Sequence, residues 1–253
     1  WSSDVCSSDL FPVRMPRSLP RPPRIAPATA AAFRRRLAAW FRREGRDLPW
    51  RRTRDPYRIL VSELMLQQTQ VSRVLDFYAR FLDRFPTLGH LAAAPPRRVM
   101  ESWAGLGYYA RARNLHALSR HVHATRDGVL PAEPHELRAL PGVGAYTAGA
   151  VASFAFERRA ALVDTNVARV LARVFAPQLN PKRPRDLTQL WAIADAVLPR
   201  TGRAAWTHNQ ALMELGALVC TARVKKCEAC PVRRLCPSRD TPIPLRRRRP
   251  TKA

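Results

Sequence analysis

The stretch LPGVGAYTAGAV, residues 140–151, contains the turn that best defines the fold of this chain. Its first five residues join two segments in which apolar residues recur at three- and four-residue spacing, about 133–139 and 145–156. Glycines at both ends of a tight turn leave backbone N–H groups facing outward, and the following helix adds its own amides and dipole. Gly142 and Gly144 are therefore candidates for binding a phosphate through the backbone, although an ordinary helix–helix turn has the same pattern.

Helical spacing of apolar residues recurs along most of the chain. The first stripe, formed by Phe33, Leu37, Trp40 and Phe41, ends at Gly45. Further helices are predicted at about 57–84, 87–93, 96–104, 110–125, 133–139, 145–156, 164–175, 186–198 and 204–218. Short stretches such as PTLG, GLG and LPRTG separate them, and no run has the alternation of a strand. The pattern predicts an all-α fold.

The chain is strongly basic. Its 253 residues carry a formal charge of +25, and because residues 1–26 contribute +2 and residues 241–253 contribute +5, residues 27–240 keep +18. A basic folded region favours a nucleic acid as partner, with a solvated arginine-rich surface as the alternative. The hydrophobic fraction of 46% argues against a disordered chain. No apolar run approaches the roughly 18 residues of a spanning helix, so no membrane association is expected.

The two ends of the sequence differ from the rest. Residues 1–10, WSSDVCSSDL, can be encoded by a common sequencing adapter read in frame, so we expect an artefact, take Met15 as the start and leave Cys6 out of the chemistry. Residues 1–27 and the basic tail at 241–253 are predicted to be disordered. Without a signal peptide, the expected location is the reducing cytoplasm, in association with the nucleoid.

Four cysteines follow the last predicted helix, in the spacing C-x6-C-x2-C-x5-C: Cys220, Cys227, Cys230 and Cys236. Four thiols this close in a cytosolic chain are more typical of a metal site than of two disulfides or of free structural cysteines. Zinc and a [4Fe-4S] cluster both accept four thiolates, and the spacing leaves both open. Arg223, Lys225 and Lys226 lie between the first two cysteines, so the metal would brace a loop that contacts a phosphate backbone.

Two carboxylates stand out by their neighbours. Glu63 lies among Leu60, Val61 and Leu64, and an apolar environment raises the pKa of a carboxyl so that it can act as an acid near neutral pH. Asp164 directly precedes a helix of apolar period. A solvated helix glutamate and a simple N-cap are the alternative interpretations. One protonated and one ionised carboxyl in a single cleft are what cleavage of a glycosidic bond requires.

Together these motifs resemble the helix-hairpin-helix DNA glycosylases, most closely the MutY-type adenine DNA glycosylases. The resemblance covers about residues 33–239 and rests on the four-cysteine spacing and on LPWRRTRDPY (48–57), SELMLQQTQV (62–71), GLGYYARARNLH (105–116), LPGVGAYTAGAV (140–151), VDTNVARVLAR (163–173) and NQALMELGALVC (209–220). It implies a six-helix barrel domain carrying the hairpin, over 48–158, and a second helical domain, from 28–47 and 159–240, holding a [4Fe-4S] cluster on the four cysteines. DNA would lie in the groove between them.

The resemblance also implies roles for single residues. The catalytic acid that protonates adenine falls on Glu63, and the carboxylate beside the sugar falls on Asp164. Tyr146 would lie near the reaction centre, and Asn166 would help to hold the carboxylate. The remaining matches are Trp50 and Arg51 in the base pocket, and Gln68 and Tyr108 as side chains that wedge into the duplex. The implied enzyme is a monomer that excises adenine mispaired with 8-oxoguanine or guanine in double-stranded DNA.

The sequence departs from related families in two places. Endonuclease III enzymes carry a catalytic lysine just after the hairpin glycines, whereas this chain has Ala145, Tyr146 and Thr147 there. A Schiff base at this place is impossible, so a monofunctional glycosylase is expected. Typical relatives also continue into a further domain that reads 8-oxoguanine, whereas this sequence stops at Ala253. Either a short gene or a truncated sequence would explain why the sequence stops at Ala253.

Two other functions fit parts of the pattern. Short glycosylases that remove thymine from T·G mismatches also combine a tyrosine near the hairpin with a cluster, although SELMLQQTQ and LPWRR favour adenine. A non-catalytic DNA-binding module would use the hairpin and the cluster but would need neither Glu63 nor Asp164. Release of adenine or thymine from defined mismatches separates these functions.

Overall fold

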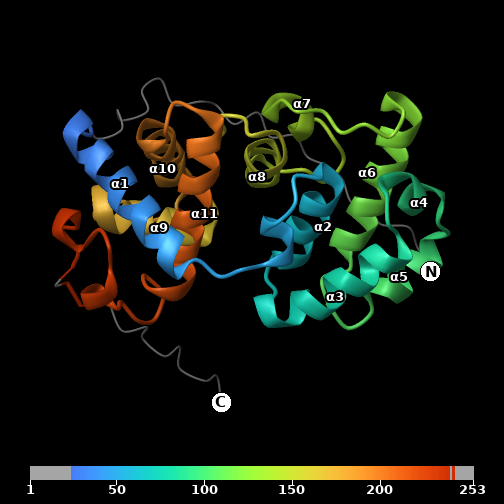
Figure 1. Ribbon diagram of the computed structural model, residues 1–253, viewed down its shortest axis with the longest axis horizontal. Helices are drawn as coiled ribbons and strands as arrows, with labels where there is room; N and C mark the ends of the chain where they lie inside the picture. Colours follow the sequence, from blue (N-terminus) through green and yellow to red (C-terminus); the bar gives the residue numbers. More distant parts are fainter. Residues whose placement is uncertain (1–23, 240, 243–253) are drawn as a thin grey trace, which may run out of the picture.

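A computed structural model describes residues 24–239 and 241–242 (Figure 1). In this part of the chain the regular structure is helical, apart from an isolated antiparallel bridge between Cys220 and Lys225. The predicted all-α class is confirmed. The adapter-like segment and nearly all of the predicted disordered ends lie outside the described residues. None of the described helices is long and apolar enough to cross a membrane.

The helices begin where prolines and capping side chains place them. The α-helices are α1 (Pro27–Glu44), α2 (Pro56–Leu66), α3 (Val71–Arg84), α4 (Leu88–Ala93), α5 (Pro96–Trp103), α6 (Ala110–Arg126), α7 (Pro134–Arg138), α8 (Ala145–Phe156), α9 (Thr165–Phe175), α10 (Pro184–Val197) and α11 (Gly202–Leu218). Three short 3-10 turns are η1 (Pro49–Arg51), η2 (Cys227–Ala229) and η3 (Arg233–Leu235). Five α-helices start with proline, whose fixed φ suits the first turn. Asp55, Thr87, Asp164 and Thr201 cap α2, α4, α9 and α11 through their side chains.

The helices form two lobes (Figure 1). The central lobe consists of α2 to α8, which are consecutive in the chain. The terminal lobe combines α1 with α9, α10, α11 and the segment 219–239, because the buried stripe of α1, formed by Phe33, Leu37 and Trp40, packs against the late helices. The Phe33 ring meets the Phe175 ring edge-on, with centroids 4.9 Å apart. Between residues 24 and 239 the chain therefore crosses between the lobes twice, at 45–55 and at 157–164.

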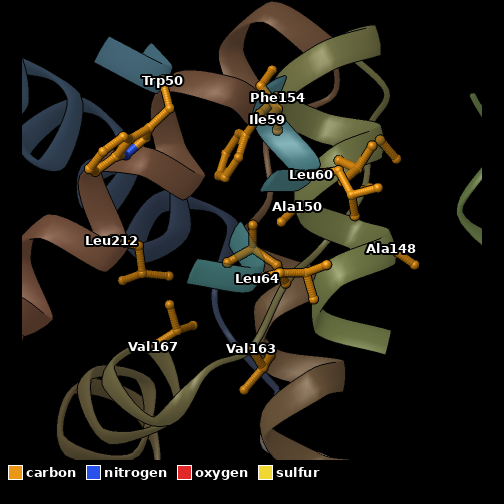
Figure 2. Packing of buried hydrophobic residues seen from close by; sticks show 14 of the residues in the cluster. Trp50, Ile59, Leu60, Leu64, Ala148, Ala150, Phe154, Val163, Val167 and Leu212 are labelled. Atoms are coloured by element: carbon orange, nitrogen blue, oxygen red, sulfur yellow. The ribbon is translucent and has the colours of Figure 1, made fainter. Parts of the chain in front are cut away.

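Two largely buried helices, α2 and α8, form the centre of the molecule. They pack against each other in the central lobe, and α8 also contacts α11 of the terminal lobe. Figure 2 shows Ile59 and Leu64 of α2, Ala150 and Phe154 of α8 and Leu212 of α11 as members of one buried cluster. Because α2 and α8 are buried on most sides, side chains at their ends are fixed in position, and these ends form the site described below.

One sequence prediction requires correction. The segment 57–84 is not a single helix: α2 ends at Leu66 and α3 begins at Val71. Gln68, in the break, has a φ of 56°, in the left-handed region that side chains disfavour. The break has a distant cause, since the buried Arg111 guanidinium on α6 donates hydrogen bonds to the last carbonyls of α2. The local spacing of apolar residues gives no indication of that contact, so the break could not be predicted from it.

Candidate active site

A cavity of about 810 Å³ opens where the two lobes meet. Its walls come from η1, from the end of α2 with the following loop, from the start of α8, from the start of α9 and from α11. The predicted residues that line it are Trp50, Arg51, Glu63, Gln68, Gly144, Tyr146, Asp164 and Asn166. Its size falls in the range of small-molecule sites.

Glu63 is buried in this cavity, with 3% of its surface exposed, so the solvated alternative for this residue is wrong. Its carboxylate oxygen Oε2 accepts a 2.7 Å hydrogen bond from the Tyr146 hydroxyl. The pKa of Glu63 is raised to about 7, mainly by burial. The hydrogen bond from Tyr146 and the charge of Arg51 oppose this rise, and the nearby charge of Asp164 adds to it. The carboxyl is therefore poised to be protonated near neutral pH.

Asp164 caps α9 and also faces the cavity, so the N-cap interpretation and the site interpretation are compatible. Its Oδ1 accepts from the Val167 amide at 2.6 Å, and its Oδ2 accepts from the Asn166 side-chain amide at 3.1 Å. Burial raises the pKa of Asp164, while these hydrogen bonds lower it. The two donors and the helix N-terminus favour the ionised carboxylate, so the two carboxyls of the cavity have different environments.

A chain of hydrogen bonds runs from Asp164 towards the cysteines. Asn166 accepts from Arg169 Nη2 at 2.7 Å, and the same guanidinium donates to the carbonyls of Gly216 and Cys220 at 2.8 and 2.9 Å. Arg169 is thereby fixed between the start of α9 and the end of α11. The orientation of the Asn166 amide, and with it the Asp164 carboxylate, depends on where the Cys220 backbone lies.

Another part of the cavity wall is an ion-pair network around the buried Glu214, which the sequence analysis missed. Glu214 on α11 accepts from Arg46 Nε at 2.8 Å and from Arg51 Nη2 at 2.9 Å. These partners hold the pKa of Glu214 at about 2 against the effect of burial. Arg51 Nε also donates to Gln210 Oε1 at 2.8 Å. Glu214 and Gln210 belong to the quoted stretch NQALMELGALVC, and their spacing of four residues on one helix face was the available signal.

Trp50 also lines the cavity. Its indole is buried and meets the Tyr78 ring edge-on, with centroids 5.4 Å apart. A fixed aromatic face on a cavity of this size can stack against a planar heterocycle.

Gln68 and Tyr108 lie in loops with unusual backbones. Both are exposed, Tyr108 with 58% of its surface, and both have positive φ, 56° and 49°. Gln68 lines the cavity, whereas Tyr108 is not among its lining residues. The two loops nevertheless share one buried partner, Arg111, which donates to Gln67 O at 2.6 Å and to Gly107 O at 3.0 Å.

The turn at 140–144 lies on the surface between α7 and α8. Gly142 has a φ of 73°, and a Cβ built there would lie 2.6 Å from the Cβ of Asn114 on α6. Gly144, at the N-cap of α8, has a negative φ and no atom within 4 Å of such a Cβ. Both glycines are exposed around the buried Val143, so the turn presents backbone rather than side chains to solvent.

The four cysteines line one cavity beside α9 and α11, formed by residues 219–239. Arg173 Nη1 donates to the sulfur of Cys220 at 3.2 Å. Burial, with smaller contributions from the other cysteines, raises the pKa of Cys230 to about 11. A positively charged metal centre would reverse this repulsion and bind the thiolates. Among the described residues, no three metal-binding side chains are close enough to hold a single ion.

A family model for HhH-GPD superfamily base excision DNA repair proteins matches residues 61–192. The chain is 45% identical to an adenine DNA glycosylase of Homo sapiens, over 84% of this chain and 40% of that protein. It is 42% identical to an adenine DNA glycosylase of Mycobacterium tuberculosis, over 86% of this chain and 71% of that protein. The chain thus spans about two fifths of the length of the first curated relatives it matches.

Solved structures agree on the fold. A thermostable thymine-DNA glycosylase superposes with a TM-score of 0.75 at 32% identity, covering 83% of this chain and 96% of that one. A trapped covalent intermediate of endonuclease III with DNA superposes with a TM-score of 0.71 at 24% identity, covering 85% and 98%. Both matches therefore cover most of this chain.

Proposed function

The chain belongs to the HhH-GPD superfamily of base excision DNA repair proteins, and we propose that it is a monofunctional adenine DNA glycosylase. One observation carries the proposal: Glu63, with a pKa near 7, and the capped carboxylate of Asp164 line the same cavity. That pair is suited to breaking an N-glycosidic bond, because one group supplies a proton and the other a negative charge.

Glu63 acts as the general acid. Its protonated carboxyl donates a proton to a ring nitrogen of the base, and the bond between that base and the sugar C1′ breaks with both electrons leaving on the base. Protonation makes the base a neutral leaving group, which lowers the barrier. The Tyr146 hydroxyl keeps the carboxyl in place, because it is the partner of Oε2 in the absence of substrate.

Asp164 stabilises the sugar that remains. Bond cleavage leaves a positive charge shared by C1′ and the ring oxygen, and a fixed carboxylate beside them lowers the energy of that cation. Water then adds to C1′ and releases a proton to solvent or to a carboxylate. The products are the free base and an abasic site.

Among the described residues that line the cavity, none carries an amine that could form a Schiff base. The basic side chains there are Arg46 and Arg51, and the residues after Gly144 are Ala145, Tyr146 and Thr147. The proposed enzyme therefore hydrolyses the glycosidic bond without cutting the strand.

The adenine would occupy the space between Trp50 and the wall formed by Arg51 and Glu214. The Trp50 indole supplies a stacking face, and the Arg51–Glu214 pair keeps its polar atoms fixed by mutual hydrogen bonds. The substrate we propose is adenine opposite 8-oxoguanine or guanine in double-stranded DNA. The enzyme would bind it as a monomer in the cytoplasm, at the nucleoid. The net charge of +18 over 27–240 and the exposed backbone of the turn at 140–144 support phosphate binding.

We assign the four cysteines to a [4Fe-4S] cluster. The donor set in the cavity is all thiol, without imidazole or carboxylate, and Arg173, Lys225 and Lys226 around it suit a centre of net negative charge. When bound, the cluster crosslinks Cys220, Cys227, Cys230 and Cys236 and so fixes the end of α11. Through Arg169 and Asn166, that fixes the site of the Asp164 carboxylate.

The deciding experiment measures base release from defined duplexes under single-turnover conditions. We expect adenine to be released from A·8-oxoguanine and A·G duplexes, with alkali needed to cut the strand. Glu63→Gln serves as the control, because an amide keeps the shape but cannot donate a proton, and it should reduce the rate by about 10²- to 10⁴-fold. Thymine release from T·G without adenine release would favour the thymine glycosylase alternative, which the structural match supports. Tight DNA binding without release of either base would favour the non-catalytic module.

A further inference from the structure

Arg111 on α6 is a buried cation whose hydrogen-bond partners are all neutral. Its residue exposure is 7%, and its partners are backbone carbonyls and one hydroxyl. An arginine is costly to bury without a carboxylate, so its retention needs a cause beyond filling space. The contacts show what this guanidinium connects.

One half of the guanidinium holds the end of α2. Its Nη1 lies within hydrogen-bond distance of the carbonyls of Leu64, Met65 and Gln67, at 2.8, 2.8 and 2.6 Å, and of the Thr69 hydroxyl, at 3.2 Å. These acceptors lie on both sides of Gln68, which has left-handed φ. The unpaired carbonyls of a helix C-terminus need donors, and here one distant side chain supplies them.

The other half holds the loop between α5 and α6. Nη2 donates to Gly107 O at 3.0 Å and to Leu106 O at 3.5 Å, and Nε donates to Tyr108 O at 3.4 Å. The guanidinium carbon also lies 5.3 Å from the Tyr108 ring centroid and 5.5 Å from the Trp103 ring centroid. Tyr108, like Gln68, is a non-glycine residue with positive φ.

Gln68 and Tyr108, two exposed residues with disfavoured backbone conformations, are thus both held in place by the buried Arg111 guanidinium. Backbone strain of this kind persists only where the surroundings impose it. Here the Arg111 guanidinium donates to peptide carbonyls beside both residues. If one loop relaxes, the guanidinium has to move, and its hydrogen bonds to the other loop are then disturbed as well.

We propose that Arg111 is a positioning residue that couples the two loops and so presents Gln68 and Tyr108 to the duplex as one rigid wedge. The inference rests on the proposed function and on the wedge role that the family resemblance implies for these two side chains, which would fill the gap left by a flipped adenine. Arg111 does not touch DNA in this mechanism. Its effect is on how far the base is extruded, which precedes the chemistry at Glu63.

The first test measures amide hydrogen exchange in the free protein, which needs no substrate. Arg111→Lys keeps the charge but replaces a fork by a single ammonium, and Arg111→Met removes both. We expect exchange to accelerate in 66–70 and in 104–109 together, by about tenfold or more, as expected for local opening of protected amides. Arg120→Met, an exposed charge change further along α6, should leave both segments as in the wild type. Acceleration in 66–70 alone would overturn the coupling and leave only a helix cap.

The second test uses 2-aminopurine placed beside the mismatched adenine, whose fluorescence rises when a side chain unstacks it. We expect Arg111→Lys to lower that rise to the level of the Gln68→Ala/Tyr108→Ala variant. Combining all three changes should cause no further loss. Single-turnover excision at saturating protein should fall by about 10- to 100-fold, the scale of a misplaced reacting group.

These outcomes separate the inference from the proposed function. If the wild type releases no adenine, the proposed function fails, and the exchange experiment still decides whether Arg111 couples the loops. A full fluorescence rise in Arg111→Lys, or an additive loss in the triple variant, would overturn the positioning role. Should Arg111→Met not fold, Arg111→Lys and Thr69→Val carry both measurements, because each removes only part of the network.

Discussion

The hydroxyl of Tyr146, in the first turn of α8, donates a 2.7 Å hydrogen bond to Oε2 of the buried Glu63 on α2. The bond stabilises the ionised carboxylate and so opposes the effect of burial on the pKa of Glu63. The tyrosine therefore lowers the pH up to which the proposed acid stays protonated.

The rate of adenine release should depend on pH accordingly. Glu63 is protonated below its pKa of about 7, so the rate should fall as pH rises through 7, by about tenfold per unit well above it. In Tyr146→Phe the carboxylate loses a donor, its pKa rises further, and the alkaline limb should move to higher pH. Single-turnover rates across the neutral range give both curves. A limb that moves to lower pH would contradict this account of the hydrogen bond.

Asp164 offers a way to separate charge from capping. Asparagine is as good an N-cap as aspartate, so Asp164→Asn should leave the melting temperature nearly unchanged while it reduces adenine release by about 10²-fold or more. Asp164→Ala should lose both the carboxylate charge and the helix cap, and the loss of the cap should lower the free energy of unfolding by about 1 kcal/mol. Thermal melts and single-turnover kinetics on the same samples test the pair. Equal rates for Asp164→Asn and the wild type would remove the carboxylate from the mechanism.

The two turn glycines should respond differently to alanine. Gly142→Ala places a Cβ 2.6 Å from Asn114 at a φ of 73°, so it should destabilise the fold by about 1–3 kcal/mol and weaken DNA binding. Gly144→Ala meets no atom within 4 Å and should be nearly neutral in the melt. Denaturant unfolding and binding titrations of both variants provide the comparison. Equal effects of the two changes would count against the turn geometry described above.

Iron content tests the cysteine site. Anaerobically purified protein should be yellow-brown, absorb broadly near about 400 nm and contain about four irons per chain. Removing the iron should lower base release together with thermal stability, because the end of α11 loses its crosslink. Stoichiometric zinc without iron would show that the thiols bind a single ion instead.

DNA affinity should be steeply salt-dependent. If the folded region neutralises about 5 to 8 phosphates, the logarithm of the binding constant should fall against the logarithm of salt concentration with a slope of roughly −4 to −7. Titrations of the catalytically inactive Glu63→Gln protein at several salt concentrations measure it. A slope near zero would mean that the positive charge is a solvated surface.

The helices could be predicted from the sequence because their signals are local. Apolar spacing, N-terminal prolines and capping side chains all act within one or two turns, and the predicted ends of α8 agree with the structure to the residue. The break between α2 and α3 could not be found this way, because its cause, Arg111, lies more than forty residues from Gln67. A side chain that caps a helix from so far away leaves no periodic pattern.

In the site, too, local features could be predicted from the sequence and contacts between distant residues could not. An apolar neighbourhood was enough to predict a raised pKa for Glu63, since burial is its main cause. The role of Glu214 was missed although its sequence was noted, because its partners Arg46 and Arg51 are over 160 residues away in the chain. Pairs of this kind become visible only when the two lobes are assembled.

The two crossings of the chain between the lobes set an order of events during synthesis. A nascent chain that has emerged as far as Phe156 contains every helix of the central lobe. At that point α1 still lacks its partners α10 and α11 and the rings of Phe175 and His208 that contact Phe33. Domains generally fold as units as they leave the ribosome. We therefore expect ribosome-bound intermediates to be protected from protease over α2 to α8 while α1 is still cut, until the chain beyond Leu218 is exposed.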